Sequence, residues 1–367
     1  MRSGARSDMR SGRPGTRSGR LGAPPGAPGS LTRMAEPGAL PLRRARAIAE
    51  NLLWPAAGEI DRSPVVPVRF LDALAGAGLY GLYGPTDSGG LDADAPTAGR
   101  VVATLAGASC VTAFVWVQHH SAVRLAGVAP PGLRDLWLPR LCSGEVRSGI
   151  AVAAMRRPGP PAMTARPGSA GGGWQLDGEA PWVTGWGLVD VVVVAARHGD
   201  DLVWALIDAE TAPSLRVVPQ TLAAEQASST VTLHLSRHPV APDRVLAVEP
   251  YDQWRARDAR GLRQNGYFPV GIAERAARLL ESRTLAEQAE ALATALAERP
   301  DAEVPALRAE ASLLAVRAAT TLVATRGGRA MGLDDPAQRL ARDAMFLLVF
   351  GQTPVIRAEQ VGRLRAG

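Results

Sequence analysis

The spacing of apolar residues divides this chain into three parts. From Leu40 to Gly127, apolar residues recur every three or four positions, which is the period of a helix with one buried face. Between about Ser148 and Val248 the pattern changes to short runs rich in β-branched residues, separated by glycine, proline and aspartate, as in strands joined by turns. After Tyr251 the helical spacing returns. The pattern therefore predicts helices, then strands, then helices.

Individual elements follow from the same pattern. Strands are expected at Gly149–Ala154, Trp174–Leu176, Val189–Ala196, Leu202–Ile207, Leu215–Val218 and Thr230–Leu235. In the last part, helices are expected at Trp254–Arg283, Leu285–Glu298, Val304–Thr325 and Pro336–Arg365, with prolines and a Gly-Gly pair at the breaks. Strands of this kind form a barrel or a sandwich, and four long antiparallel helices form a bundle.

The expected fold class is a multidomain α+β protein. Its parts are a tail at 1–33, an N-terminal helical domain at 34–147, a middle β-barrel domain at 148–248 and a C-terminal four-helix bundle at 249–367. Apolar residues make up 46% of the chain and charged residues 21%, which is typical of a globular protein with a large core. No apolar run reaches the roughly 18 residues of a spanning helix, so we expect no membrane segment and a cytoplasmic location.

The formal charge of +6 lies in the tail. Residues 1–33 contain seven arginines and one aspartate, so the remainder of the chain is balanced. A balanced body does not favour nucleic-acid binding. The tail has almost no apolar residues to bury, so we expect it to be disordered and dispensable for folding. It lacks the apolar core of a secretory signal, and Met34 is the expected true start, with a functional basic arm as the alternative.

Cysteine and histidine give no metal signature. Cys110 and Cys142 each lie in an apolar stretch and are isolated in the sequence, so we expect buried, reduced thiols. His119 and His120 end an apolar helix, with no carboxylate or thiol at ligand spacing. This context favours a structural role for both histidines, and no metal is expected.

One turn carries most of the chemical information. In it, Trp182 and Trp186 flank Thr184 just before an expected strand. An aromatic face beside a hydroxyl suits a flat cofactor that needs stacking and a hydrogen bond at its edge. The run GEAPWVTG at 178–185 resembles the G-x-K-x-[WF]-I-[TS]-[NG] turn of the acyl-CoA dehydrogenase superfamily, which packs against the isoalloxazine ring of FAD. The alternative is that both tryptophans only close the end of the barrel.

Other segments resemble the same superfamily in the same order. They are AGEIDR at 57–62, FLDALAGAGLYGLYGP at 70–85 and LWLPRLCSGE at 136–145. The resemblance covers about residues 40–365 and implies an FAD held between the middle domain and the C-terminal bundle. It also implies a homodimer or homotetramer in which a neighbouring subunit meets the adenosine end. On this resemblance Trp182, Val183 and Thr184 contact the flavin.

The strand before this turn departs from the superfamily pattern F-x-x-T-E-P-x-x-G-S. The corresponding residues at 150–159 read IAVAAMRRPG, and Ala153 stands where the family has a threonine that meets the flavin. The backbone at Ala151 and Ala153 is still expected to contact the cofactor. Arg156 and Arg157 are candidates for a pyrophosphate or a CoA phosphate, because guanidinium groups suit phosphate geometry. The alternative is ordinary solvated loop charge.

A glycine-containing loop also resembles the superfamily. The run TRGGRAMG at 325–332 is similar to the Q-x-x-G-G-x-G-[YF] loop that meets the adenosine pyrophosphate across the dimer. Glycines let a backbone approach phosphate closely. On this resemblance Arg326, Gly327 and Gly328 bind the cofactor, and Arg329 adds charge. An ordinary connection between two helices is the alternative.

The catalytic base of the superfamily has no counterpart in the sequence. In the family reaction a carboxylate removes the α-proton of an acyl thioester while hydride leaves the β-carbon for the flavin. In most members that glutamate lies in a Y-E-G-T turn, and the matching residues at 350–353 are FGQT, with Gly351 at the base position. A minority of members use a position that falls near Gly261. Asp258, one helical turn away, is a weak candidate for the base.

Three interpretations follow. The first is an FAD-dependent oxidoreductase that oxidises the Cα–Cβ bond of a CoA or carrier-protein thioester, with an unusual base or an unusually acidic substrate. The second is a monooxygenase of the same fold that uses reduced flavin and O2. The third is a catalytically silent subunit of a heteromeric dehydrogenase. Electron transfer or flavin reduction by a partner protein is expected in the first two, while chain length and carrier stay open.

Overall fold

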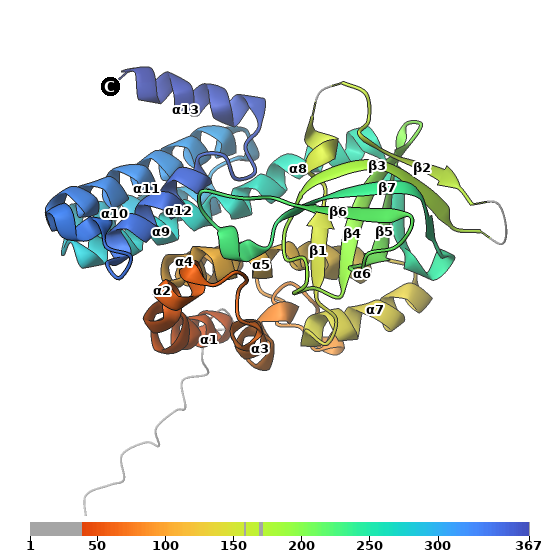
Figure 1. Ribbon diagram of the computed structural model, residues 1–367, viewed down its shortest axis with the longest axis horizontal. Helices are drawn as coiled ribbons and strands as arrows, with labels where there is room; N and C mark the ends of the chain where they lie inside the picture. The colour runs from red at the N-terminus through yellow and green to blue at the C-terminus, as the bar shows by residue number, and fades with distance from the viewer. Residues whose placement is uncertain (1–38, 158, 169–171, 367) are drawn as a thin grey trace, which may run out of the picture. The chain divides into compact units, whose positions relative to one another are not determined.

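The computed structural model describes residues 39–157, 159–168 and 172–366 (Figure 1). Helices come first, strands follow, and helices return, so the predicted order and the α+β fold class are confirmed. The tail at 1–33 and Met34 lie outside the described residues. The described residues pack as one compact unit, and the bounds of the three expected domains stay a prediction.

The first part of the described chain is helical. Its segments are α1 (Ala39–Ile48), the π-helical turn η1 (Ala49–Leu53), α2 (Trp54–Arg62), α3 (Val68–Gly76), η2 (Leu79–Gly81), η3 (Thr86–Ser88), α4 (Ala95–Ala108), α5 (Cys110–Gln118), α6 (His120–Gly127) and α7 (Pro131–Ser143). The side chain of Asp94 caps α4 by accepting a 2.7 Å hydrogen bond from the Thr97 amide. Gly144, with φ +76°, ends α7 in the left-handed region that favours glycine.

The middle part is a sheet in the order β6-β7-β3-β2-β4-β5-β8, with β1 added in parallel to β4. Its strands are β1 (Ser148–Ala151), β2 (Met163–Pro167), β3 (Trp174–Val183), β4 (Val191–His198), β5 (Asp201–Asp208), β6 (Leu215–Pro219), β7 (Val231–Val240) and β8 (Val245–Pro250). Short turns η4 (Ala153–Arg156), η5 (Gln226–Ser228) and η6 (Pro242–Arg244) connect them. The run Val191–Ala196 is wholly buried, as expected of a central strand.

The strand predictions differ from the structure at three places. Strands β2 and β8 were not expected, and β3 runs to Val183 instead of ending at Leu176. Two register shifts interrupt β3, which explains why its sequence lacks regular alternation. The eight strands form one sheet whose outermost strands, β6 and β8, are not paired with each other within the described part of the chain.

The last part consists of α8 (Tyr251–Asn265), α9 (Tyr267–Leu279), α10 (Arg283–Glu298), η7 (Asp301–Glu303), α11 (Val304–Arg326), η8 (Gly327–Met331), α12 (Pro336–Leu347) and α13 (Pro354–Ala366). Helices α9, α10, α11 and α12 pack together as the expected bundle (Figure 1). Two expected helices are each divided in the structure. The first breaks at Gly266, and the last breaks in the turn 348–353, where Gly351 has φ +54°.

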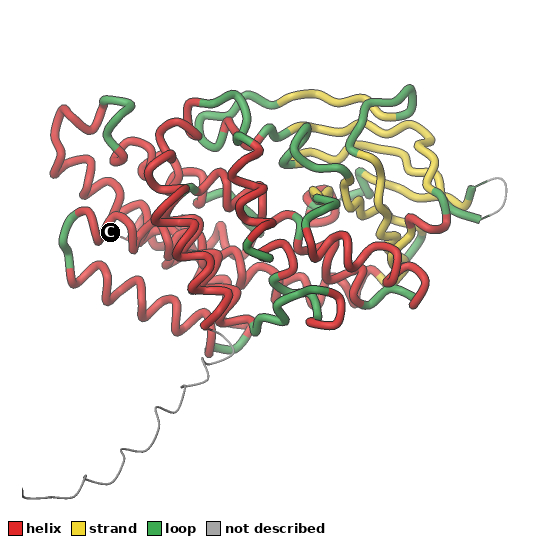
Figure 2. Tube along the Cα trace, turned by 90° about the horizontal axis from the view of Figure 1, so that it is seen from below, coloured by secondary structure: helices red, strands yellow, loops and turns green. Residues whose placement is uncertain are grey.

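The buried side chains form two cores. One joins α1–α5 to the bundle, and the other joins the sheet to α6, α7 and Trp254. Figure 2 shows the strands gathered beside the long helices. In the first core α4 crosses α9 at very short range, because Gly107 and Gly271 carry no side chain there. The N-terminal helices are therefore divided between the two cores, which periodicity alone did not predict.

Candidate functional site

Trp182 occupies an unusual position at the end of β3. The register between β3 and β7 shifts between Ala180 and Val183, and Trp182 adopts φ +62° at this irregularity. Its side chain is 53% exposed, whereas its neighbours Pro181 and Val183 are buried. A bulky residue in the left-handed region is strained. The chain thus holds a large aromatic face out toward solvent at an energetic cost.

The hydroxyl of Thr184 is bonded inside the protein. Thr184 is 2% exposed, and its Oγ1 lies 3.2 Å from Oγ1 of Thr230, which in turn lies 2.7 Å from Oγ of Ser228. The backbone amides of Gly185 and Trp186 donate to the carbonyls of Ser228 and Ser229. The segment around η5 therefore fixes the turn at 182–187 through side-chain and backbone hydrogen bonds.

The expected backbone partners lie on neighbouring elements. Ala151 ends β1 and is buried, and Ala153 begins the turn η4. Both β1 and η4 contact β3. A Cβ placed on Gly149 of β1 would lie 3.0 Å from the carbonyl oxygen of Thr184, so β1 runs directly beside the turn. The structure thus brings the elements carrying Ala151, Ala153 and Thr184 together.

Arg156 forms a bidentate ion pair with Asp258. Its Nε and Nη2 each donate a 2.8 Å hydrogen bond to one carboxylate oxygen of Asp258, and both side chains are largely buried. This pair joins η4 to the first C-terminal helix, α8. Both oxygens of Asp258 are therefore engaged, and the guanidinium of Arg156 is no longer free. Arg157 is exposed beside it.

The turn at 348–353 contains Gly351 and is held by a buried arginine. Arg308 of α11 is 2% exposed and donates to the carbonyls of Phe350 (2.7 Å) and Gly351 (2.8 Å). Burial, followed by the charge of Arg156, lowers the pKa of Arg308 to about 9. A Cβ placed on Gly351 would lie 2.7 Å from Nδ2 of Asn265. The side-chain amide of Asn265 thus borders the position where the family carries its base.

Gly261 differs from Gly351 in its surroundings. It lies on the exposed side of α8, and a Cβ placed on it would meet nothing within 4 Å. Gly261 and Asn265 are four residues apart, so they share one face of the helix. Neither expected base position holds a carboxylate. Sequence reasoning missed Asn265 and Arg308 because nothing in their local sequence distinguishes them from ordinary helix residues.

Helix α5 contacts both turns. The side chain of Val115 would lie 3.5 Å from a Cβ placed on Gly185, and the ring of Phe114 packs edge-on against Phe350, with centroids 5.1 Å apart. Phe268 and Phe346 complete this aromatic group. One short buried helix therefore contacts both the Thr184 turn and the Gly351 turn.

A buried acidic cluster joins the same two regions. The Sγ of Cys110 and carboxylate oxygens of Glu225 and Asp343 all lie within 4.8 Å of one another. Glu225, with φ +59°, precedes η5, and Asp343 lies on α12. The thiol of Cys110 is free and buried, as expected. The two carboxyl groups lie far from Cys110 in sequence, so sequence spacing did not indicate this cluster.

The charge of this cluster is partly compensated. Arg339 lies 3.6 Å from Asp343, and Arg342 makes a bidentate pair with the nearby Asp61. Burial raises the pKa of Glu225 well above its ordinary value, and the charge of Asp343 raises it further. Burial also raises the pKa of Asp343 to about 6, against the opposing effect of Arg339. Both carboxyl groups of the cluster thus have raised pKa values, and Arg339 is the cation that faces Asp343.

The glycine-containing loop contributes to a surface pocket. Its volume is about 440 Å³, and it is lined by Arg326, Arg329, Gly332, Asp334, Asp335 and Pro336. The lining residues come from one stretch of chain, 326–336. Gly327, with φ +60°, ends α11 and allows the sharp turn into η8. The pocket presents two guanidinium groups beside the carboxylates of Asp334 and Asp335.

The adjacent histidines are structural. Nδ1 of His119 accepts a hydrogen bond from the Ser148 amide, and its Nε2 donates to the carbonyl of Leu141. Burial lowers the pKa of His119 to about 3 and that of His120 well below its ordinary value. His120 packs edge-on against Trp116 and Tyr83.

Within the described residues, no helix is both long and apolar enough to cross a membrane.

The fold and these residues can be compared with known proteins. A family model described as "Acyl-CoA dehydrogenase, N-terminal domain" matches residues 41–145. A 3-sulfinopropanoyl-CoA desulfinase from Variovorax paradoxus is 25% identical over 225 residues, which are 56% of this chain and 54% of that protein. The chain thus spans about half the length of this curated relative.

Solved structures share the fold over nearly the whole chain. Butyryl-CoA dehydrogenase from Megasphaera elsdenii superposes with a TM-score of 0.76 at 18% identity, covering 90% of this chain and 99% of that one. A glutaryl-CoA dehydrogenase from Mycobacterium smegmatis in complex with FADH2 gives a TM-score of 0.73 at 16% identity, covering 92% and 97%. At such identities the likeness concerns the fold.

Proposed function

We propose that this chain is an FAD-dependent oxidoreductase acting on an acyl thioester, because residues 41–145 match an acyl-CoA dehydrogenase N-terminal domain and the fold is that of solved acyl-CoA dehydrogenases. The observation that carries this proposal is Trp182, held half-exposed at φ +62° beside the buried Thr184. Strained backbone persists where the surroundings impose it, and such positions cluster at ligand sites. A core-filling role does not account for an exposed ring.

The residues present fit a flavin. Trp182 offers an aromatic face, the backbone of Ala151, Ala153 and Val183 lies on adjoining elements, and Thr184 directly follows the strand β3. FAD, when bound there, would supply a two-electron acceptor for the substrate. The pocket at Arg326 and Arg329 suits a pyrophosphate. Since that pocket is built from a single stretch of chain, we assign Arg326, Gly327 and Gly328 to the cofactor of a neighbouring subunit in a homodimer or homotetramer.

The relatives support a thioester substrate. The desulfinase and both dehydrogenases reported above carry a CoA thioester in their names. Arg157 is exposed next to the Arg156–Asp258 pair and is our candidate for a CoA phosphate. Arg156 contributes to phosphate binding only if it leaves Asp258. The carrier, CoA or a carrier protein, belongs to the same proposal.

The base position favours a second candidate. Gly351 and Gly261 carry no carboxylate, and both oxygens of Asp258 accept hydrogen bonds from Arg156, which weakens Asp258 as a proton acceptor. A reaction that removes an α-proton therefore proceeds without a carboxylate base, and its rate is lower by typically 10²- to 10⁴-fold. A monooxygenase that uses reduced flavin and O2 does not need that base. This observation makes it the runner-up.

The test starts with the absorption spectrum of the purified protein. We expect flavin bands that bleach slowly under anaerobic conditions with an acyl-CoA. Gly261→Glu places a carboxylate on an open helical position without strain, and we expect it to speed bleaching by about 10²-fold. Gly362→Glu, also in open helical space but on α13, is the matched control.

Each other outcome points elsewhere. A protein that purifies without flavin and binds none when FAD is added is a silent subunit. A flavoprotein that resists bleaching by several chain lengths, with and without Gly261→Glu, is not an acyl-thioester dehydrogenase. If its chemically reduced form then reoxidises rapidly in O2 and yields a hydroxylated product, the monooxygenase proposal replaces the first.

A further inference from the structure

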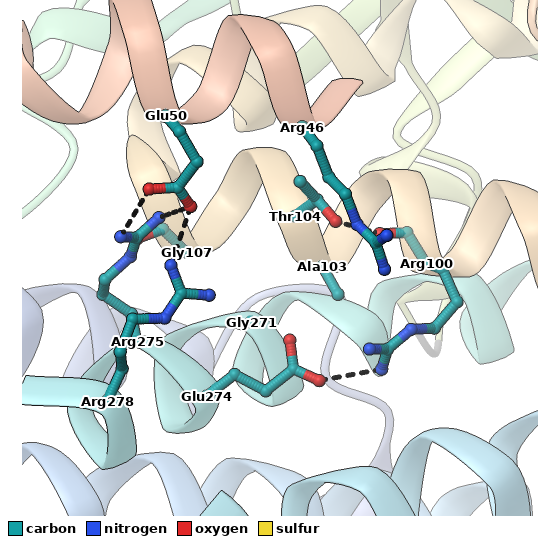
Figure 3. A pocket seen from close by; sticks show the side chains of 10 residues that line it. All are labelled: Arg46, Glu50, Arg100, Ala103, Thr104, Gly107, Gly271, Glu274, Arg275 and Arg278. Atoms are coloured by element: carbon teal, nitrogen blue, oxygen red, sulfur yellow. Dashed lines mark hydrogen bonds and ion pairs between the residues drawn. The ribbon is translucent and has the colours of Figure 1, made fainter. Parts of the chain in front are cut away.

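A second, separate pocket lies among the helices, between α1, η1, α4 and α9 (Figure 3). Its volume is about 250 Å³, and its charged residues are Arg46, Glu50, Arg100, Glu274, Arg275 and Arg278. None of these residues belongs to the site proposed for FAD or the thioester. The pocket therefore needs its own explanation.

Small residues keep the pocket open. A Cβ placed on Gly271 would lie 2.0 Å from the carbonyl oxygen of Ala103, and one placed on Gly107 would lie 2.5 Å from the carbonyl oxygen of Gly271. The backbones of α4 and α9 are thus in direct contact at their crossing. No long side chain fills the space between this crossing and α1. The floor of the pocket is rigid backbone, and its walls are charged.

Glu50 and two arginines form one wall. Arg275 donates to both carboxylate oxygens of Glu50 (2.7 and 3.2 Å), and Arg278 donates to one of them (2.8 Å). Arg275 is 5% exposed, donates through Nε to the carbonyl of Gly107, and stacks over Trp54 at 4.3 Å. The hydrogen bond from Arg275 is the main cause that lowers the pKa of Glu50. This wall is fixed and carries a surplus positive charge.

The opposite wall has a different charge balance. Arg100 pairs with Glu274 at 2.8 Å and with Glu290, outside the pocket, at 3.2 Å. Figure 3 shows Arg46 descending from α1 on this side, above Arg100 and near Thr104. Among the described residues, no carboxylate lies within ion-pair distance of Arg46. With Glu290 counted, four guanidinium groups face three carboxylates, and Arg46 is the one left over.

We propose that this pocket binds a small oxyanion, either inorganic phosphate or a simple carboxylate, with Arg46 as its principal partner. The guanidinium fork matches both groups in a bidentate arrangement. The volume lies below the roughly 300 Å³ at which pockets for drug-sized ligands begin, so a nucleotide is too large. An anion here supplies the missing negative charge and joins α1 to α4 and α9. Its binding stabilises the folded protein by mass action.

The experiment is calorimetric titration of the flavin-loaded protein with sodium phosphate and, separately, with sodium acetate, at constant ionic strength. We expect millimolar affinity for at least one of them, weakened about 10-fold or more in Arg46→Ala, because one charge-assisted partner is worth at least about a factor of ten. Binding of phosphate alone assigns a phosphate site, and binding of acetate assigns a carboxylate site.

Two controls keep the result specific. Arg43→Ala removes an exposed arginine from the same helix outside the pocket and is expected to leave the affinity unchanged. Arg216→Ala removes an exposed arginine of β6 that lines neither pocket and is likewise expected to have no effect. The proposal fails if neither anion binds, or if Arg43→Ala or Arg216→Ala weakens binding as much as Arg46→Ala.

Discussion

The turns at 182–187 and 348–353 both contact α5, and they match the superfamily pattern to different degrees. The first keeps the tryptophan, the threonine and the glycine of the superfamily pattern and is held by hydroxyl groups and backbone hydrogen bonds. The second has Gly351 where that pattern has a glutamate, and it is held by the buried Arg308. The turn that matches the pattern is fixed by neutral hydroxyl and amide groups, whereas the turn that departs from it is fixed by a buried charge.

The two turns are not independent. Glu225 precedes η5, the segment that fixes Thr184, and Asp343 lies on α12, the helix that leads to Gly351. Their carboxyl groups meet Cys110 at the start of α5. A change in this cluster therefore acts on both sides of α5. Variants of Arg308, Glu225, Gly351 and Thr184 separate the contributions of the two turns.

Arg308→Met is expected to have the largest effect. It removes two charge-assisted hydrogen bonds and leaves the carbonyls of Phe350 and Gly351 without their donor. Each such bond is worth about 1.5–3 kcal/mol, and the relief of a buried charge offsets part of the loss. We expect the free energy of unfolding, measured in urea, to fall by about 2–4 kcal/mol.

A second arginine on the same helix provides the control for Arg308. Arg317 is exposed and donates to the Gln288 side chain, so Arg317→Met is expected to change stability by less than about 0.5 kcal/mol. If Arg308→Met is as stable as the parent, the turn at 348–353 does not depend on this arginine. The contrast drawn between the two turns would then be unfounded.

Glu225→Gln tests the link between the turns through its pH dependence. The folded state keeps the protons of Glu225 and Asp343 to higher pH than the unfolded chain, where carboxyl groups titrate near about 4. The folded state therefore binds more protons than the unfolded chain, and its stability falls as pH rises. Asp343 contributes to this fall between about pH 4 and 6, and Glu225 continues it at higher pH. A glutamine at 225 keeps the hydrogen-bonding group and cannot ionise.

The variant is therefore expected to match the parent near pH 4 and to be more stable above pH 7, by about 1–3 kcal/mol. Groups that face the pair, namely Cys110, Asp61, Arg339 and Arg342, are unchanged in both proteins. Glu210→Gln, at an exposed glutamate, is the control and is expected to show no such divergence. Parallel pH profiles for Glu225→Gln and the parent would show that Glu225 is already ionised.

Gly351→Ala is expected to cost about 1–2 kcal/mol. The residue has φ +54°, which side chains other than glycine adopt at about this cost, and the new Cβ meets Asn265 at 2.7 Å. Gly362→Ala, on a helix in open space, is expected to be neutral or stabilising. Equal effects of the two variants in urea unfolding would remove the claim of strain at 351.

The strain at Gly351 and its contact with Asn265 also limit what a glutamate at this position can do. Gly351→Glu carries the strain of Gly351→Ala and places its carboxylate against Asn265. We expect it to raise the rate of flavin bleaching only when combined with Asn265→Ala, and by less than the open variant Gly261→Glu. If the folded, flavin-loaded Gly351→Glu variant alone bleaches about 10²-fold faster, the side chain of Asn265 moves aside at little cost.

The sequence predicted the order of elements but not all of their partners. Periodicity located the helices of the bundle and the central strands, because each buries one regular face. It did not show that α6 and α7 join the core of the sheet, since a pattern identifies a buried face and not what covers it. The breaks at Gly266 and Gly351 were missed because the apolar spacing continues through them.

The candidate site shows the same limit. Motif resemblance pointed to Trp182 and Thr184, and it aligned Gly351 with the expected base position. It gave no sign of the positive φ at Trp182, which arises from pairing between β3 and β7. Asn265 and Arg308 lie on ordinary helical sequence, and Glu225 and Asp343 are brought together only by tertiary contact. Contacts of this kind depend on the fold as a whole.

Thr184→Val is expected to have the smallest effect on stability and to sharpen the comparison most directly. Valine has nearly the same shape, so the change removes one hydroxyl from the row that Thr184 forms with Thr230 and Ser228. Thr230 keeps Ser228 as a partner, and we expect a loss of about 1 kcal/mol. If the hydroxyl also meets the flavin, affinity for FAD falls several-fold or the reduction potential of the flavin shifts.

Thr232→Val on β7, which removes a hydroxyl that accepts a hydrogen bond from Gln220, controls for the loss of stability alone. Equal destabilisation by the two variants, with FAD affinity and potential unchanged in both, would assign Thr184 a purely structural role and leave Trp182 as the side chain of this turn that serves the cofactor.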